Sequence, residues 1–391
     1  MTTVFETLTT LYPTSEALFD HLRSPIGGSH MIMEEDGGHR ALIYYSKNAS
    51  NTRGEFRSVV WNKTTNKPLS VSPAYGHRFS AAIDSALAPG SFSVEEYIDG
   101  TMVNQYYDGT AWRVSTRTRL DADNSFYGKR TFAELFQEAF AAVGLKTDML
   151  NPGMSYSWVL QHPEERNVVA PAYGIPSIYL VHTYGGSRMI DVAPTTIYPK
   201  QIALRTLEEV KDYVAAEGRR RGHQFKGVCL KTPQGVRYKL RSTEFEAACA
   251  LRGNQAKRAY TWLERWTEKK LTAYLRIYPE EQCDADAVIE KFKQITQDAY
   301  DLYQQVYRTR TLRLGESPQK YRKLLWDAHQ AGKGAYFPHM RDFVNGQETR
   351  RKLWLVNYES RYAANSAEMP TPTPTPTTIT EFATPTPTVS T

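Results

Sequence analysis

The segment Val94-Glu95-Glu96-Tyr97-Ile98-Asp99-Gly100-Thr101-Met102-Val103 places an Asp-Gly turn between two short apolar runs. Just after it, the strand-like runs 102–107 and 112–115 flank Asp108-Gly109. Because glycine readily adopts the positive φ that tight turns require, this second Asp-Gly pair predicts a β-hairpin. On its own the first Asp-Gly is no more than a turn, but its position beside the hairpin makes it the reference point for the surrounding chain.

Further β-rich runs occur on both sides of this segment. They lie at Ala41–Tyr45, Arg57–Trp61, Ser157–Gln161, Ser177–Tyr184 and Gly227–Lys231. Helical patterns at residues 131–143 and 207–216 interrupt these strands. Because strands and helices do not alternate regularly, we expect an α+β fold with antiparallel sheets and helices on the outside.

The pattern becomes helical after residue 255. An apolar face with steps of three and four is formed by Phe292, Ile295, Ala299, Leu302 and Val306. We therefore expect an α+β domain over residues 1–250 and a helical domain over 255–362. Residues 363–391 are Pro-Thr repeats, which cannot bury a core and predict a disordered tail.

The composition excludes several classes of protein. The chain has 391 residues, of which 41% are hydrophobic and 23% charged, so it is neither disordered throughout nor a disulfide-stabilised miniprotein. No apolar run is long enough for a transmembrane helix, and Met1–Leu11 lacks the features of a signal peptide. We expect a protein with no membrane partner, at an intracellular, cytoplasmic location. A net charge of +6 is compatible with a polyanionic partner.

Taken in order, several segments resemble the motifs of covalent nucleotidyltransferases, in particular the bacteriophage-type RNA ligases. Tyr97-Ile98-Asp99-Gly100 is similar to the family's first motif, Lys-x-Asp-Gly-Ser. Other segments that resemble the family lie at residues 56–61, 77–79, 158–169, 225–230 and 236–242. The resemblance covers residues 30–245 and implies an adenylyltransferase fold, with two antiparallel sheets around a cleft.

The resemblance also implies a chemistry. In the family, a lysine attacks the α-phosphate of ATP and carries AMP as a phosphoramidate. Carboxylates of the third and fourth motifs hold or orient a divalent metal ion. Lysines of the fifth motif contact the nucleotide phosphate and stabilise the transition state.

This sequence departs from the family at the reacting groups. Tyr97 stands at the position of the nucleophilic lysine, and Val159 and Lys226 stand at the positions of the two acids. We therefore expect that the divalent metal site is lost, with no metal-ligating residue, while ATP remains the implied cofactor. Arg241 replaces the second lysine of the fifth motif. The residues that the resemblance places at nucleotide or phosphate contacts are Arg57, Asp99, Gly100, Arg117, Lys226, Lys239 and Arg241.

The same residues have simpler interpretations. Asp99-Gly100 could merely end a strand. Lys239 and Arg241 alternate with Tyr238 and Leu240, as on any half-exposed strand. The densest basic run, Arg219–Arg221, could be a solvated helix end.

Three functions follow as alternatives. The first is an RNA-ligase-like protein that binds nucleotide or RNA but does not ligate. The second is a structural or interaction protein that uses the fold to contact other subunits of an assembly, such as a viral particle in the virion. The third is an active RNA ligase in which Tyr97 serves as the catalytic nucleophile, although a phenol with an ordinary pKa near ~10 would need activation.

Overall fold

The computed structural model describes residues 3–35, 37–45, 54–80, 83, 87–186 and 198–361. The chain divides into two compact units, Met1–Cys283 and Asp284–Thr391. This division lies later than the expected boundary near residue 250, because helices that follow that residue pack with the first unit. The Pro-Thr tail expected over 363–391 lies outside the described residues.

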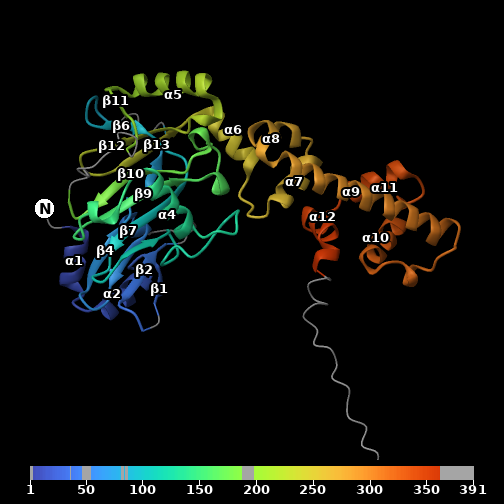
Figure 1. Ribbon diagram of the computed structural model, residues 1–391, viewed down its shortest axis with the longest axis horizontal. Coiled ribbons are helices and arrows are strands. Elements are labelled where there is room, and N and C mark those ends of the chain that lie inside the picture. Colours follow the sequence, from blue (N-terminus) through green and yellow to red (C-terminus); the bar gives the residue numbers. More distant parts are fainter. Residues whose placement is uncertain are drawn as a thin grey trace, which may run out of the picture. The chain divides into compact units, whose positions relative to one another are not determined.

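Three β-sheets form the framework of the first unit (Figure 1). The first sheet has the order β1 (Met31–Glu34), β2 (Arg40–Tyr44), β3 (Val59–Asn62), β4 (Lys67–Val71). The second has the order β10 (Ser177–Tyr184), β9 (Ser155–Gln161), β7 (Thr101–Tyr107), β8 (Trp112–Ser115). The third has the order β11 (Gln201–Ile202), β6 (Ser93–Glu96), β12 (Gly227–Lys231), β13 (Arg237–Arg241), β5 (Gly76–Arg78).

The expectation of an α+β fold with antiparallel sheets is confirmed. The structure adds one sheet, because β1–β4 form a layer of their own whose last strand, β4, contacts β7 and β9 of the second sheet. The third sheet is mixed, since β13 pairs in parallel with β5 and antiparallel with β12. The predicted hairpin is present: β7 and β8 pair in register from Asn104–Ser115 to Tyr107–Trp112.

The described helices of the first unit pack on these sheets or on one another. They are α1 (Val4–Leu11), α2 (Ser15–Arg23), α4 (Phe132–Ala142), α5 (Leu207–Arg221), α6 (Thr243–Arg252), α7 (Arg258–Thr267) and α8 (Leu271–Ile277). Thr131 begins α4 and Thr206 begins α5 with reciprocal capping boxes, in which a glutamate three residues later bonds back to the cap. Figure 1 shows α5 along the third sheet, where it packs on β12 and β13.

The alternation along β13 orients the cationic side chains. Tyr238 and Leu240 pack against the buried cluster that contains Val210 and Val214 of α5. Because successive side chains of a strand point to opposite faces, the odd-numbered residues of β13 point away from α5. They face the space between the second and third sheets.

The second unit is helical. It contains α9 (Gln282–Tyr303, which begins two residues before the division), a π-helical turn at Gln304–Arg308, α10 (Gln319–Gln330), α11 (Phe337–Asn345) and α12 (Thr349–Val356). Of the predicted apolar face, Phe292, Ile295 and Ala299 are buried, whereas Leu302 and Val306 are only half-buried. Tyr303 is buried as well, because it lies four residues after Ala299 on the same face of α9. Val306 lies in the π-helical turn that follows.

No helix within the described ranges is long and apolar enough to cross a membrane.

Candidate functional site

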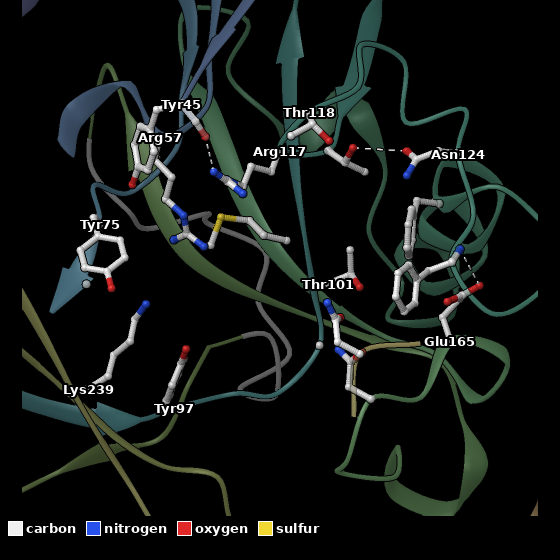
Figure 2. A pocket seen from close by; sticks show the side chains of 18 of the residues that line it. Tyr45, Arg57, Tyr75, Tyr97, Thr101, Arg117, Thr118, Asn124, Glu165 and Lys239 are labelled. Atoms are coloured by element: carbon white, nitrogen blue, oxygen red, sulfur yellow. Dashed lines mark hydrogen bonds between the residues drawn. The ribbon is translucent and has the colours of Figure 1, made fainter. Parts of the chain in front are cut away.

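A cleft of about 790 Å³ opens between the second and third sheets. Six of the residues singled out in the sequence line it: Arg57, Tyr97, Gly100, Arg117, Lys239 and Arg241. Figure 2 shows Lys239 and Tyr97 side by side on one wall, with Arg57 and Arg117 reaching in from the other. These residues come from chain segments far apart in the sequence, and the sheet pairings bring them together.

Tyr97 follows β6 and is half-buried among cations. Its backbone amide donates to the Gly227 carbonyl at 2.9 Å. The ammonium of Lys226 lies 4.0 Å from the centre of the phenol ring, and that of Lys239 lies 5.5 Å away. Burial alone would raise the pKa of Tyr97, but the charges of Lys226, Lys239 and Arg241, with a hydrogen bond from Arg241, lower it to about 8.

Asp99 and Lys226 form a pair behind the wall of the cleft. Lys226 Nζ lies 3.1 Å from Asp99 Oδ1, and both side chains are almost fully buried. Asp99 Oδ2 accepts hydrogen bonds from the amides of Val168 at 2.9 Å and Val169 at 3.0 Å. Burial opposes ionisation of this carboxyl, yet Lys226 and the two amides lower the pKa of Asp99. The carboxylate is therefore engaged within the protein, and Asp99 is not among the residues that line the main cleft.

Gly100 allows the chain to turn from the third sheet into the second. Its φ is +145°, and a Cβ at this position would lie 2.2 Å from the carbonyl oxygen of Leu160. Only glycine tolerates both the positive φ and this close approach. The Asp-Gly pair thus forms the turn that holds Tyr97 beside β7.

Arg57 and Lys239 face the cleft without a carboxylate partner among the described residues. Burial lowers the pKa of each side chain. The charge of Arg237 lowers the pKa of Arg57 further, and the charges of Arg57 and Arg237 lower that of Lys239, against an opposing effect of Tyr97 on both. Lys239 passes close over Gly76, where an added Cβ would lie 2.4 Å from Lys239 Cε. Arg117 is held differently, since it donates to the Tyr45 carbonyl at 2.5 Å and stacks on the Tyr45 ring.

Arg237 is a cation that the sequence analysis did not include in the site. It is only 7% exposed, and within the described part of the chain its Nε and Nη1 atoms have no hydrogen-bond partner. It lines a smaller inner pocket of about 110 Å³, together with Arg57, Tyr97 and Lys239. The two-residue period of β13 could have identified it, because Arg237 lies on the same face as Lys239 and Arg241.

Aromatic and polar side chains form the outer part of the cleft, and they too were not predicted. The aromatic residues are Tyr45, Tyr75, Phe126 and Phe132. Glu165 also lines the cleft, but its carboxylate accepts hydrogen bonds from the amides of Tyr127 at 3.0 Å and Gly128 at 2.8 Å. It therefore orders the loop that carries Phe126 and is not available as a free acid.

The residues of the cleft do not fit a divalent metal ion. The two positions at which the resemblance would require acids hold Val159 and Lys226. Asp99 and Glu165 are bound by protein donors. Glu95 and Glu96, which line the smaller pocket beside the cleft, form ion pairs with Lys231 and Arg221. Within the part of the chain that the structure describes, no group of three or more His, Cys, Asp or Glu side chains could hold a metal.

The basic run at the end of α5 is largely neutralised. Arg220 pairs with Glu217 at 2.6 Å, and Arg221 pairs with Glu96 at 2.8 Å. Arg219 is exposed. The run therefore forms a paired helix end, apart from the cations of the cleft.

Comparisons with known proteins gave structural neighbours alone. No protein-family model matches the sequence, and no curated protein matches it. An archaeal ATP-dependent RNA ligase is similar in structure, with 12% identity, a TM-score of 0.43, and coverage of 94% of this chain and 83% of that chain. A putative ATP-dependent DNA ligase from Aquifex aeolicus has 11% identity and a TM-score of 0.39, and the match covers 90% of this chain and 80% of that one. An RNA ligase from Naegleria gruberi has 14% identity and a TM-score of 0.31 over 45% of this chain and 57% of that chain. Values this low do not assign the chain to the ligase family.

Proposed function

We propose that the cleft binds the phosphates of a nucleotide or of RNA without forming a covalent intermediate. The observation that carries this proposal is the convergence of Arg57, Lys239 and Arg241 on one space, where no carboxylate pairs with Arg57 or Lys239 among the described residues. Cations gathered without counterions attract a polyanion, and phosphate is the anion that nucleotides and RNA present.

The surroundings of these cations support the same proposal. The aromatic rings of Tyr45, Tyr75 and Phe126 line the outer cleft, where a base could stack. The acids that would recruit a metal are replaced by Val159 and Lys226, and the position of the reactive amine is a phenol. The charge of the site therefore favours holding an anion over activating ATP with a metal ion.

The test is a binding titration of labelled single-stranded RNA and of a labelled nucleotide, over a range of salt and with EDTA present. We expect affinity to fall steeply with salt, and Lys239→Met to reduce the salt slope by about one phosphate contact. Arg219→Met removes an equal charge from the exposed end of α5 and should leave binding unchanged. If the protein bound neither ligand, the proposal would fail, and the alternative of an interaction protein in an assembly would remain.

A second candidate function is that Tyr97 accepts AMP from ATP. It is favoured by one observation: the neighbouring cations lower the pKa of Tyr97 to about 8, so the phenolate is accessible near neutral pH. The phenolate oxygen would attack the α-phosphorus, and the bond to pyrophosphate would break, leaving AMP on Tyr97 and free pyrophosphate.

This candidate is tested by incubation with α-labelled ATP and Mg²⁺ or Mn²⁺, followed by denaturing electrophoresis. Label on the wild-type chain that is absent from Tyr97→Phe would establish the covalent reaction and refute non-covalent binding as the sole function. Absence of label from both chains, with nucleotide affinity retained, would eliminate this candidate.

A further inference from the structure

We propose that Arg57, Arg237 and Lys239 form an inner subsite that binds a terminal phosphate group without a divalent metal ion. The inference rests on the proposed function and deepens it, because it names the chemical group that reaches the deepest part of the cleft. The ligand class is a phosphomonoester or free phosphate, as opposed to an internal phosphodiester.

The first argument is the state of Arg237. Its side chain is buried, and two of its three guanidinium nitrogens have no hydrogen-bond partner among the residues that the structure describes. A buried charge without a counterion costs free energy, since the desolvation is not repaid by any partner. A guanidinium presents a fork of donors that matches the oxygens of phosphate, so an oxyanion in the inner pocket would satisfy it.

The second argument is that the acids lining the inner pocket are already engaged. Glu95 forms an ion pair with Lys231 at 2.5 Å and accepts from Gln201 at 3.2 Å. Glu96 pairs with Arg221 at 2.8 Å. Neither has a hydrogen bond or ion pair to Arg237, Arg57 or Lys239 within the described ranges, so the excess positive charge of the pocket remains.

The third argument is size and access. The inner pocket has a volume of about 110 Å³, well below the range of pockets that enclose whole small-molecule ligands. It shares Arg57, Tyr97 and Lys239 with the wall of the outer cleft. A phosphate at the end of a nucleotide or strand could enter past these residues while the rest of the ligand stays outside. An internal phosphodiester would have to bring a nucleoside on each side, for which the pocket has no room.

The charge of this subsite also makes a metal ion unnecessary. In a metal-assisted site the cation neutralises the phosphate oxygens, whereas here two guanidinium groups and two ammonium groups line the pocket. Lys226 is already paired with Asp99, which leaves the two guanidinium groups and Lys239 for the phosphate. Binding should therefore persist in EDTA.

The first experiment is thermal unfolding of the full chain in EDTA with inorganic phosphate, AMP or adenosine, at matched ionic strength set with NaCl. We expect phosphate and AMP to raise Tm by roughly 2–4 °C at saturating concentration, and adenosine to leave it unchanged. Inorganic phosphate tests binding of free phosphate, and AMP tests binding of a phosphomonoester. A rise in Tm with AMP alone would place the site outside the inner pocket and overturn the inference.

Arg237→Met is the decisive variant. The substitution removes an unpaired buried charge, so the Tm of the variant without ligand should equal or exceed that of the wild type. The rise in Tm on addition of phosphate should be lost. Arg219→Met is the matched control and should keep the full shift. A phosphate shift that persists in Arg237→Met would overturn the inference. If Arg237→Met does not fold, Lys239→Met provides the same comparison.

The second experiment separates this inference from the proposed function. It compares RNA oligonucleotides of one sequence that carry either a terminal phosphate or a terminal hydroxyl. We expect the phosphorylated RNA to bind at least about tenfold more tightly to the wild type, and the difference to vanish in Arg237→Met. Equal, salt-dependent binding of both RNAs would overturn the subsite and leave the proposed function. Phosphate stabilisation without affinity for either RNA would support the subsite and refute RNA binding.

Discussion

The hydroxyl of Tyr97 lies among cationic side chains that come from β13 and from the residue before β12. At the scale of single residues, this setting changes the chemistry of an ordinary phenol. Lys226 covers one side of the ring at 4.0 Å, and it is itself held by the buried carboxylate of Asp99. The charge that acts on Tyr97 is therefore fixed in place by a residue that does not line the main cleft.

The pKa of Tyr97 yields a first prediction. The difference between the ultraviolet absorbance titrations of wild type and Tyr97→Phe should show one phenol that ionises near pH 8. Because the folded pKa lies below the ordinary value near ~10, the unfolded chain binds more protons between these values. The wild type should therefore gain roughly 1–2 kcal/mol of stability relative to Tyr97→Phe as pH rises from 8 to 10, and lose it again as pH falls through 8. A phenol that titrates only near pH 10 would contradict this.

Gly100 yields a second prediction, with a matched control within the chain. Gly100 and Gly109 both have positive φ, at +145° and +100°. A Cβ at Gly100 would meet the Leu160 carbonyl, whereas nothing lies within 4 Å of one at Gly109. Chemical denaturation should show a loss of more than about 1 kcal/mol for Gly100→Ala, and a clearly smaller loss for Gly109→Ala, which bears the backbone strain alone. Equal losses would mean that the close contact with Leu160 has no energetic weight.

At the scale of elements, the segment after β9 connects the cleft to the helices α6–α8. The amides of Val168 and Val169 hold Asp99, while the nearby Arg166 donates to the carbonyls of Val168 at 3.1 Å and Ile277 at 2.9 Å. Ile277 is the last residue of α8. Helix α8, which the sequence predicted as part of the helical domain over 255–362, thus supports the segment that holds Asp99.

A buried ion pair between these helices yields a third prediction. Glu281 lies 2.7 Å from Arg252, and it also accepts from Trp262 at 2.8 Å and Tyr274 at 2.6 Å. Glu281→Gln would leave the buried Arg252 without its counterion, and we expect a loss of about 3–5 kcal/mol in denaturant unfolding.

The control for this pair is Asp20→Asn, which removes the exposed partner of Arg23 at 3.6 Å. Exposed pairs contribute at most about 1 kcal/mol, so this variant should be close to the wild type. A comparable loss of unfolding free energy in both variants would show that burial does not account for the contribution of the Arg252–Glu281 pair to stability.

At the scale of the whole molecule, the chain consists of two compact units, and the division between them along the sequence lies in the first turn of α9. The cleft and all the cations discussed above belong to the first unit. The second unit has a helical core of its own, which includes Phe292, Ile295 and Ala299.

This division yields a fourth prediction. Calorimetry of the full chain should resolve two unfolding transitions, because compact units with separate cores tend to unfold separately. Gly100→Ala should lower one transition. Phe292→Ala, which removes a fully buried ring, should lower the other by the equivalent of about 3–5 kcal/mol. If each variant shifted both transitions equally, the units would form one cooperative structure.

The local features of the fold were predictable from the sequence, because each depends on neighbours along the chain. The Asp108-Gly109 hairpin follows from the backbone freedom of glycine, and the start of α4 at Thr131 follows from its capping residues. The resemblance implied phosphate contacts for Lys239 and Arg241 and the nucleophile position for Tyr97, and the three side chains line one cleft. The alternation of β13 was visible as well, although it did not reveal which face would be buried.

Only the tertiary structure determined the interactions between distant segments of the chain. Arg57 meets Lys239 because three sheets pack around one space, and no spacing in the sequence encodes that meeting. Arg237 is a buried cation with two unbonded guanidinium nitrogens among the described residues, while Glu95 and Glu96 pair with Lys231 and Arg221. The sequence predicted α7 and α8 as part of the helical domain, whereas the structure places them in the first unit, where α8 packs on α6 and its last residue accepts a hydrogen bond from Arg166. Periodicity describes which side of an element is apolar, whereas burial and charge pairing depend on what the rest of the chain brings to that side.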